Sequence, residues 1–504
     1  MTLDKQELRT LRQLLVYTAE RYCERPCIKY VENGEIEQRS FLRMKNDSLS
    51  FAGYLCSFIP ARTHISVIGK TSYKYLCALN GVMAAGMTAV PLDPNADAQD
   101  TAALVKDSDS EVIVCAAELM PLAEEIEKIN GRKYITVNYE KDPLAFSFEG
   151  SELPAEDAEK CAVIIYTSGT TGDKKGVMLS NRNIVSNILF KEMSYEGENV
   201  ALNTLPMHHI FCFSCDYLKN MLDGVTLCLN GELSNIGENL LRFRPTVVRM
   251  VPMVIEGLLK KIRIVRKRNP DLTARQAAER VFGDRITNII ASGAYLNPST
   301  GREFDEMGIN LRQGYGMTET GPRIAVPNGK TDPDSAGAVI SICDIRIQDG
   351  EIQVKSPSVM MGYYKKPEET AKVFTEDGWF KTGDMGRVAP DRQLYITGRL
   401  KNVIILSNGE NVSPEEIEKR FTDIPLIKEV MVYGENDVIT AEFYPDTEYA
   451  AANGITDIEK EIAVIVNKTN LSGSTDREVG KIKLRNSPFE KTSSGKIIRK
   501  AVKY

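Results

Sequence analysis

A segment rich in glycine and hydroxyl side chains, Tyr166–Gly176, reads YTSGTTGDKKG and directly follows the apolar run AVII. Glycines let the backbone curl, so hydroxyls and backbone amides can converge as donors on phosphate oxygens, and Lys174 or Lys175 would add positive charge. The spacing of a Walker A loop does not fit in any register. The segment therefore predicts a phosphate-binding loop of another kind, with a flexible surface turn as the alternative.

A second glycine-rich segment, Leu311–Gly321, reads LRQGYGMTETG. It is not a dinucleotide-binding fingerprint, because Glu319 stands where the last glycine should be. An acidic residue beside hydroxyls in a glycine turn suits a magnesium ion that bridges phosphates. The alternative is a carboxylate that favours the start of a helix.

Two further segments carry a charged residue in a turn. Trp379–Asp384 reads WFKTGD, and a carboxylate so placed can bind two neighbouring ribose hydroxyls, although aspartate is also an ordinary turn residue. Glu490–Lys496 reads EKTSSGK and lies near the end of the chain. A lysine on such a loop can bring a cation to developing phosphoryl charge; a solvated basic tail is the alternative.

The stretch HHIFCFSC contains His208, His209, Cys212 and Cys215, so a zinc site has to be considered. Zinc sites of this kind normally come with a second paired module, and no such module lies nearby in the sequence. Only three histidines occur in the whole chain. The pattern therefore argues against zinc.

Short apolar runs rich in β-branched residues predict the strands that must position these segments. The runs span residues 65–68, 112–115, 162–166, 246–251 and 286–291. They are apolar on both faces and separated by helical stretches, which is typical of largely parallel α/β sheets. An amphipathic helix is expected over residues 8–19, ahead of the first of these runs.

From about Ile340 the sequence changes to strands and turns with many Gly and Pro residues, and Asp349-Gly350 predicts a hairpin. A helix is expected to begin near Pro414, where acidic residues follow in the first turn. The last hundred or so residues are expected to form a compact α+β unit. The best domain boundary lies near Arg399.

Composition excludes several classes of protein. The 504 residues carry 63 basic and 69 acidic side chains, a net charge of −6, so whole-molecule attraction to nucleic acid is not expected. Ten scattered cysteines lack the density of a disulfide scaffold, and no apolar stretch approaches the length of a membrane span. The N-terminus has no signal-peptide pattern. We expect a cytoplasmic globular enzyme or binding protein.

A basic run, Lys260–Arg268, contains six basic residues and no acidic one. A solvated helix face is the default interpretation. The alternatives are peripheral contact with an anionic lipid surface and contact with an acidic acyl-carrier protein.

Taken together and in order, the motifs YTSGTTGDKKG, QGYGMTET, WFKTGD, GRLKNVIILSNGENVSPEEIE and KTSSGKIIR resemble those of the adenylate-forming (AMP-binding) superfamily. The segments LPMHHIFCF and ASGAYLNP are similar to bacterial long-chain fatty acyl-CoA synthetases. The resemblance implies a large N-terminal domain, residues 1–398, of stacked α/β sheets with a small barrel-like β subdomain. It also implies a small mobile α+β domain, residues 399–504, with a hinge near Asn402.

The resemblance also implies roles for individual residues. The expected ATP-binding residues are Thr167, Ser168, Gly169, Thr170, Thr171, Gly172 and Lys175 at the phosphates, Gly293, Ala294, Tyr295, Tyr315, Gly316 and Met317 at the adenine side, and Asp384, Ile396 and Arg399 at the ribose side. The expected catalytic residues are Lys496, Glu319 and Thr318, and the expected magnesium ligands are Thr170 and Glu319. His209, Gly314 and Gly409 are expected to contact the acid or the thiol, with His209 as a gate of the acyl pocket.

In this superfamily a carboxylic acid attacks the α-phosphate of ATP, pyrophosphate leaves, and a thiol then displaces AMP from the acyl-adenylate. The expected acid is a medium- or long-chain fatty acid, and the expected thiol is coenzyme A. The alternative is the phosphopantetheine of an acyl- or peptidyl-carrier protein, loaded with a fatty, aryl or amino acid; Asp216 lies near the position that binds an α-amino group in amino-acid-activating relatives. A nucleotide-binding protein without catalysis is the competing class.

Two positions depart from the superfamily pattern. Asn402 stands at the hinge, where an acidic residue or lysine is usual, and Lys174 stands where proline usually precedes the phosphate-loop lysine. Neither change removes a catalytic group. No carrier-type Asp-Ser attachment motif occurs in the sequence, so the acceptor thiol is expected to come from outside the chain.

Overall fold

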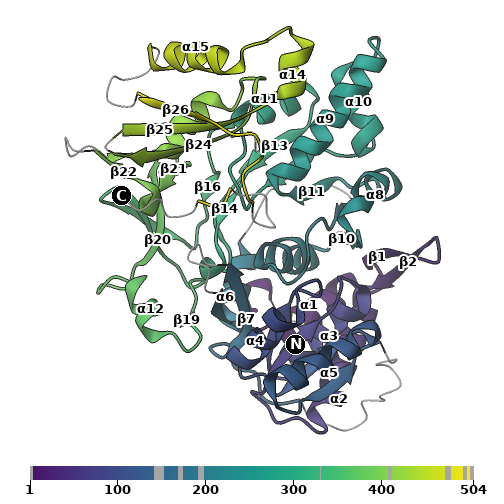
Figure 1. Ribbon diagram of the computed structural model, residues 1–504. Helices are drawn as coiled ribbons and strands as arrows, with labels where there is room; N and C mark the ends of the chain where they lie inside the picture. Colours follow the sequence, from purple (N-terminus) through teal and green to yellow (C-terminus); the bar gives the residue numbers. More distant parts are fainter. Residues whose placement is uncertain are drawn as a thin grey trace.

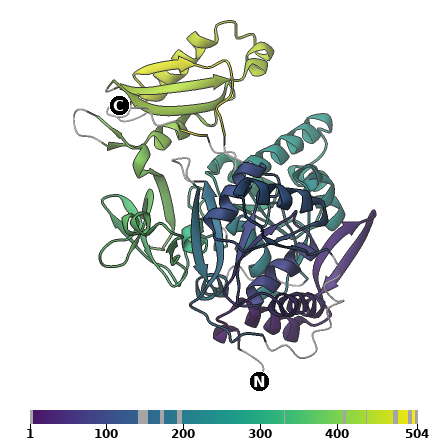
Figure 2. The ribbon, with the colours of Figure 1, turned by 60° about the horizontal axis from the view of Figure 1, so that its bottom comes forward.

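The structure is a computed structural model that describes residues 4–140, 153–168, 174–190, 198–329, 331–406, 411–436, 438–471, 478–491 and 497–499. Within these ranges two seven-stranded sheets form most of the N-terminal part, and smaller sheets follow along the chain (Figure 1). In Figure 2 the C-terminal residues form a lobe that stands apart from the purple, blue and teal part. The expected fold class, stacked α/β sheets with a smaller α+β C-terminal part, is confirmed.

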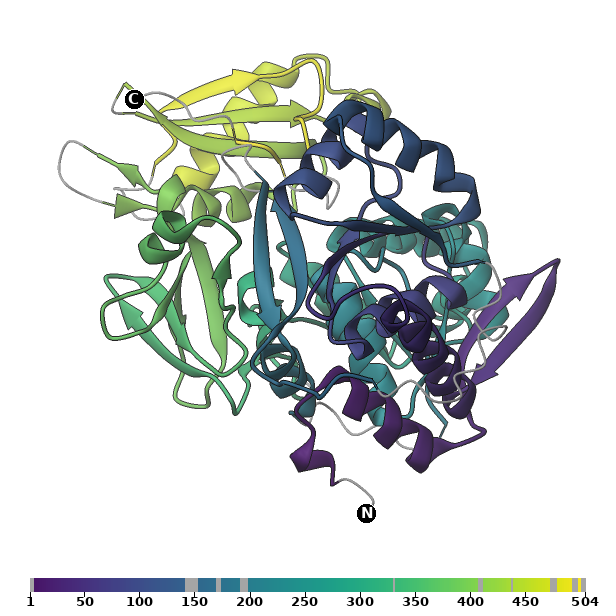
Figure 3. The same cartoon turned by 90° about the horizontal axis from the view of Figure 1, so that it is seen from below.

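The first sheet contains the strands on either side of the predicted phosphate loop. Its strands are β3 (His64–Ile68), β4 (Thr88–Leu92), β5 (Val112–Cys115), β6 (Ile135–Asn138), β7 (Cys161–Ser168), β8 (Lys174–Ser180) and β19 (Gly362–Tyr363), in the order β19-β8-β7-β4-β3-β5-β6. β7, β4, β3, β5 and β6 run parallel, whereas β8 is antiparallel to both β7 and β19. In Figure 3 the β7–β8 pair lies between the dark blue and the green parts of the molecule.

Helices cover both faces of this sheet because alternate strand residues are apolar on each side. The helices are α1 (Leu11–Tyr22), α2 (Phe41–Cys56), α3 (Tyr73–Ala84), α4 (Ala98–Asp107), α5 (Met120–Asn130) and α6 (Asn181–Leu189). α1, α2, α3 and α6 share one core with Ile65 and Val67 of β3, while α4 and α5 share another with Ile68. The expected opening helix is thus present, beginning three residues later than predicted.

The second sheet is parallel except for an antiparallel hairpin at one edge. Its strands are β1 (Pro26–Glu32), β2 (Glu35–Ser40), β9 (Val200–Leu202), β10 (Thr226–Cys228), β11 (Val247–Met250), β12 (Asn288–Ala291) and β13 (Asn310–Gln313), in the order β13-β12-β11-β9-β10-β1-β2. All five predicted strands are found in these two sheets.

The helices that accompany the second sheet follow its strands in the chain. They are a π-helical segment, η4 (Phe211–Leu218), and α7 (Lys219–Asp223), α8 (Ile236–Phe243), α9 (Pro252–Arg268), α10 (Ala274–Phe282) and α11 (Pro298–Glu306). Ile255 of α9, Phe282 of α10 and Phe304 of α11 pack in one core with β11 to β13. The basic run forms the end of α9, where Arg263 pairs with Glu303 and the other basic side chains are exposed.

A β-rich region follows the second sheet. It comprises β14 (Tyr315–Gly316), β15 (Arg323–Val326) and β16 (Ala338–Val339) in one small sheet, β17 (Asp344–Gln348), β18 (Glu351–Lys355), β20 (Phe380–Val388) and β21 (Leu394–Arg399) in another, and the helices η6 (Thr318–Thr320) and α12 (Pro367–Lys372). The predicted hairpin joins β17 to β18, with Asp349 and Gly350 at φ 51° and 80°.

The C-terminal part has a core of its own, which includes Ile404, Val432 and Phe443. Its elements are η7 (Leu400–Asn402), β22 (Ile404–Ile405), β23 (Asn411–Val412), α13 (Pro414–Glu418), η8 (Lys419–Phe421), β24 (Ile427–Glu435), β25 (Val438–Pro445), α14 (Thr447–Ala452), α15 (Ile458–Leu471) and β26 (Lys481–Leu484). The helix expected near Pro414 is present. No helix in the described part of the chain is long and apolar enough to cross a membrane.

Candidate functional site

The topology of the second sheet brings several predicted site residues to one edge. β13, β12, β11 and β9 are parallel neighbours, so the segments that follow their carboxyl ends lie side by side. These segments contain the predicted residues Gly314 to Met317, Gly293 to Tyr295, and His209. A backbone hydrogen bond of 2.8 Å from Gly314 N to Ala291 O joins the first two segments.

Glycine is required at two positions of this edge. A Cβ atom on Gly316 would lie 1.8 Å from the carbonyl oxygen of Pro322, so no side chain fits there. Gly293 has φ +87°, which L side chains rarely adopt. The glycines therefore let two chain segments approach closely, and Tyr295 remains 44% exposed beside them.

Tyr315, Asp384 and Arg399 form the first charged group, here called the Asp384 cluster. Asp384 and Arg399 are direct partners in the β20–β21 pairing, so their side chains share one face. Arg399 Nε lies 3.0 Å from Asp384 Oδ1, and Tyr315 Oη donates to Asp384 Oδ2 at 2.7 Å. Burial raises the pKa of Tyr315 and the adjacent Asp384 charge raises it further, so the phenol keeps its proton.

The structure corrects one expectation about Asp384. The sequence suggests a carboxylate in a tight turn, but Asp384 lies inside strand β20, only 5% exposed. The turn-like residue is Gly383, at φ 71°, and the β18–β20 register shifts beside it. The strand continues past this irregularity because Phe380 pairs with β18 before it and Val388 pairs with β21 after it.

Lys175, Glu319, Tyr363 and Glu369 form the second charged group, here called the Glu319 cluster. Lys175 Nζ lies 2.7 Å from Glu369 Oε2 and 4.9 Å from the centroid of the Tyr363 ring. Tyr363 Oη donates to Glu319 Oε1 at 2.9 Å. The neighbouring Lys174 turns away to Asp100, at 2.8 Å.

Charge in the Glu319 cluster is unevenly balanced. Hydrogen bonds from Lys175 and then Lys372 lower the pKa of Glu369 to about 2, so that carboxylate stays ionised. Glu319, by contrast, makes no ion pair within the described residues, and its Oε2 atom makes no hydrogen bond there. A carboxylate oxygen without a partner fits a hard cation such as Mg²⁺.

The turn that carries Glu319 is hydrogen-bonded to the segment before β19 and to helix α6. Met360 N donates to Glu319 O at 2.8 Å, and Asn187 Nδ2 donates to the carbonyl oxygens of Thr320 and Arg323 at 3.2 and 3.1 Å. Thr318 belongs to the same short helix, η6. The end of β7 lies beside Lys175 of this cluster, since Thr167 is the strand partner of Lys175.

Contacts also link this edge to the C-terminal part. Lys419 Nζ lies 4.7 Å from the centroid of the Tyr295 ring and donates to Ile396 O at 3.2 Å. Asn297 and Ser299 both donate to the Asp423 carboxylate, Ser299 Oγ at 2.7 Å. The predicted residues Tyr295 and Ile396 therefore lie against the C-terminal part.

The zinc alternative concerns His208, His209, Cys212 and Cys215. Among the described residues no group of three His, Cys, Asp or Glu side chains is arranged to hold a metal ion. Burial, and then the neighbouring His209, lowers the pKa of His208 to about 4, so this imidazole is neutral near pH 7.

Asp216, the residue behind the amino-acid alternative, is fully buried. Its Oδ1 atom lies 3.6 Å from Nη1 of Arg249, which is equally buried on β11. The nearby guanidinium already balances the charge of this carboxylate inside the protein, which disfavours a second cation such as an α-amino group there.

Some predicted site residues lie outside the described residues. They are Gly169, Thr170, Thr171, Gly172, Gly409 and Lys496, together with the side chain of Ser168. The structure therefore places the strands that flank the predicted phosphate loop. The roles predicted for these residues stay predictions.

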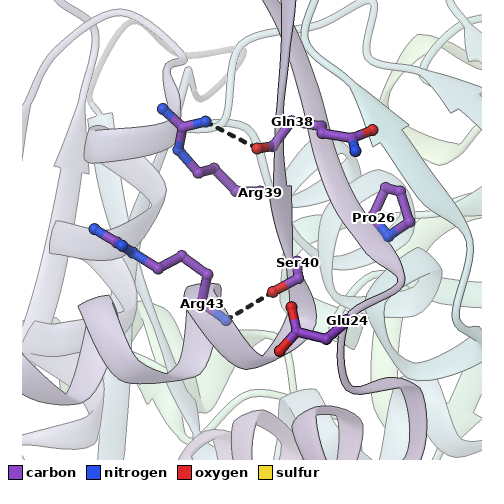
Figure 4. A pocket seen from close by; sticks show the side chains of 6 residues that line it. All are labelled: Glu24, Pro26, Gln38, Arg39, Ser40 and Arg43. Atoms are coloured by element: carbon purple, nitrogen blue, oxygen red, sulfur yellow. Dashed lines mark hydrogen bonds between the residues drawn. The ribbon is translucent and has the colours of Figure 1, made fainter.

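A surface pocket elsewhere does not belong to this site. Figure 4 shows its lining residues, Glu24, Pro26, Gln38, Arg39, Ser40 and Arg43, which lie at β1, β2 and the start of α2. Its two cations are engaged: Arg43 pairs with Asp47 at 2.8 Å and Arg39 with Glu37 at 3.0 Å. None of the predicted site residues lines it.

Solved structures confirm the fold. ATP-bound MatB from Rhodopseudomonas palustris has a TM-score of 0.80 at 22% identity, covering 96% of this chain and 97% of that one. The o-succinylbenzoate CoA synthetase MenE from Bacillus subtilis, in complex with its acyl-adenylate intermediate, has a TM-score of 0.75 at 23% identity, covering 97% and 98%.

Curated relatives include a long-chain-fatty-acid–CoA ligase of Mycobacterium bovis, 27% identical over 447 residues, which are 76% of this chain and 73% of that protein. A 2-succinylbenzoate–CoA ligase of Enterococcus faecalis is 27% identical over 487 residues, 92% and 93%. The family model of AMP-binding enzymes matches residues 15–364, and that of their C-terminal domain matches residues 401–504. The chain therefore belongs to the AMP-binding enzyme family.

Proposed function

We propose that this protein is an ATP-dependent acid–thiol ligase that activates a medium- or long-chain fatty acid and transfers it to coenzyme A. In the first step a carboxylate oxygen bonds to the α-phosphorus of ATP, and the bond from that phosphorus to pyrophosphate breaks. In the second step the thiol sulfur bonds to the acyl carbon, AMP leaves, and the thiol proton is released. Positioning and charge neutralisation are the main tasks of such an enzyme.

One observation carries the proposal. The segment 315–319 contributes Tyr315 to the Asp384 cluster and Glu319 to the Glu319 cluster, so a single turn joins the two groups. A nucleotide whose ribose hydroxyls bind Asp384 would extend its phosphates along this turn toward Lys175. The order of the two clusters thus matches the order of groups in ATP.

Glu319 would hold Mg²⁺, which when bound supplies positive charge at the phosphates. Lys175 would bind phosphate oxygens after releasing Glu369, and Thr318 would face the α-phosphate. Asp384, held by Arg399, would accept the ribose hydroxyls. Lys496 would bridge the attacking carboxylate and the α-phosphate.

The choice of a fatty acid rests on two supports. A long-chain-fatty-acid–CoA ligase is among the relatives, and the buried Arg249 beside Asp216 disfavours binding of an α-amino group at that carboxylate. The 2-succinylbenzoate relative is equally similar, so the acid panel below includes aromatic acids.

Pyrophosphate release on addition of ATP, Mg²⁺ and single carboxylic acids tests the proposal directly. We expect release with fatty acids of medium or long chain, and acyl-CoA formation once coenzyme A is added. Release with aryl acids only would overturn the fatty-acid assignment, and acylation of a carrier protein but not of coenzyme A would overturn the acceptor. Nucleotide binding without release for any acid would make the protein a binder.

The variant Lys496→Ala tests the assignment of the main cation. We expect it to abolish adenylate formation and largely to spare thioester formation from a preformed acyl-adenylate. Lys491→Ala is the matched control, because Lys491 is a nearby lysine that pairs with Glu429 at 2.6 Å. Equal loss of both half-reactions in Lys496→Ala would contradict the role.

A further inference from the structure

One side chain of the Glu319 cluster has no role in the function proposed above. Tyr363 stands between the two charges, with its hydroxyl 2.9 Å from Glu319 Oε1 and its ring centroid 4.9 Å from Lys175 Nζ. We propose that Tyr363 is a positioning residue that holds the Glu319 carboxylate and the Lys175 ammonium in place for one triphosphate and its cation. This inference rests on the proposed function.

Tyr363 is itself firmly held. Its side chain is 6% exposed, and its backbone N–H donates to Thr370 Oγ1 at 2.9 Å. That hydroxyl donates in turn to Lys366 O at 2.9 Å, which closes the turn after β19. A residue fixed by strand pairing and by a side-chain bond can hold others in place.

Strand register places the ring beside Lys175. Tyr363 of β19 is the direct partner of Val177 of β8. Lys175 lies two residues before Val177 and so on the same face of β8. Diagonal neighbours of this kind are within reach of an aromatic side chain.

The hydroxyl orients Glu319. It donates to Oε1, while the backbone carbonyl of Glu319 accepts from Met360 N at 2.8 Å, so the residue is held at both ends. Oε2 makes no hydrogen bond among the described residues. Partners of this kind fix the direction of a metal-binding carboxylate.

The ring acts on Lys175 by a cation–π contact, and the same ammonium pairs with the Glu369 carboxylate. It also separates Lys175 from Glu319, and within the described residues these two opposite charges form no ion pair. A direct pair would neutralise both groups before a nucleotide arrived. The ring thus keeps Glu319 from pairing with Lys175, whose charge is instead held by Glu369.

Nucleotide binding measured by calorimetry, with Mg²⁺ and again with a chelator, separates the two contacts. Tyr363→Phe removes the hydroxyl alone, and we expect it to weaken MgATP binding about 10- to 100-fold and to leave metal-free ATP binding unchanged. Tyr363→Met also removes the ring, and we expect metal-free ATP binding to weaken as well, about two- to five-fold.

The neighbouring Tyr364 offers a matched control, because its hydroxyl donates to a different carboxylate, Asp109, at 2.8 Å. Tyr364→Phe should alter neither measurement. If Tyr363→Phe binds both forms of ATP as Tyr364→Phe does, the inference is overturned. An equal loss of affinity for MgATP and for metal-free ATP also overturns it, because such a loss indicates a merely structural role.

A double-variant measurement guards against a general packing effect. In a Glu319→Gln background Tyr363→Phe should cost no further Mg²⁺-dependent affinity, since both changes act on one interaction. Full additivity would overturn the positioning role. Failure of the proposed function is distinguishable, because there the unmodified protein would release no pyrophosphate with any acid, whatever the variants show.

Discussion

The Asp384 cluster and the Glu319 cluster differ in how completely their charges are matched. Asp384 is buried and both of its oxygens are engaged, one by Arg399 and one by Tyr315. In the Glu319 cluster Lys175 is held by the partly exposed Glu369, and Glu319 has no cation among the described residues. Under the proposed function, the first cluster would receive neutral ribose hydroxyls, while the second would receive a ligand that brings charges of both signs.

The largest effect is expected from removing the unmatched charge. Glu319→Gln keeps the shape of the side chain and an oxygen for the Tyr363 hydroxyl, but it loses the negative charge. We expect pyrophosphate release to fall about 100-fold or more at saturating ATP, in the range found when a group aimed at reacting charge is removed. If Glu319→Gln released pyrophosphate as fast as the unmodified protein across a Mg²⁺ titration, the unmatched charge of Glu319 would not distinguish the two clusters.

Breaking the matched cluster should cost stability as well as binding. Asp384→Asn leaves the Arg399 guanidinium without its carboxylate and weakens the bond from Tyr315. We expect the free energy of unfolding to fall by about 2 kcal/mol, since one partner of a largely buried pair is removed but Arg399 is partly solvated. Urea unfolding and the KM for ATP measure the two consequences.

Tyr315→Phe is the control for this change, because it removes a single neutral donor from Asp384. We expect the free energy of unfolding to fall by about 1 kcal/mol and the KM for ATP to rise less than in Asp384→Asn. Equal effects of the two variants would show that the ion pair adds nothing to the hydrogen bond.

A smaller effect is expected at Glu369, the partly exposed partner of Lys175. Glu369→Gln frees the lysine for phosphate, so we expect the KM for ATP to fall about two- to five-fold, as for loss of one partly exposed ion pair. The thermal unfolding midpoint should hardly move. The gain should shrink at high salt, where surface charges are screened; a KM that rises instead would show that Glu369 positions Lys175 rather than competing for it.

The smallest effect concerns a cation beside the Asp384 cluster. Burial, aided by repulsion from Arg399, lowers the pKa of Lys401 from 10.5 to about 8. Between these values the unfolded chain holds a proton that the folded chain has lost, so the free energy of unfolding rises with pH across this window. Lys401→Met should therefore raise the unfolding midpoint at pH 7 and lose most of this advantage by pH 10.

Much of the scaffold could be predicted from local sequence. The run at 112–115 is apolar at every residue and the run at 65–68 at all but Ser66, which predicts strands covered on both faces. Asp349 and Gly350 supply the positive φ angles of their hairpin turn. Glu319, Asp384 and Arg399 could be named from motifs. Their grouping in space depends on strand order, which sequence patterns do not give.

Other features depend on contacts between distant residues and were missed. Tyr363 and Glu319 are 44 residues apart, and Lys175 and Glu369 are 194 apart, so no local pattern links them. The buried pairing of Arg249 with Asp216 is indicated in the sequence by one feature, an arginine inside the apolar strand run VVRM. Such a charge requires an internal partner, although its identity cannot be read from the run itself.

The link between the large part of the chain and its C-terminal part is tethered on both sides. Arg399 is anchored to Asp384, while Asn402 Nδ2 donates to Glu415 Oε1 at 2.6 Å. Only two residues, at 400 and 401, lie between these anchors. Any turning of one part against the other would have to be absorbed by their backbone torsions, once the bonds from Ser413 to Thr397 and from Lys419 to Ile396 had opened. Such a joint would allow rotation about a short segment within a restricted range, and it would not act as a flexible linker.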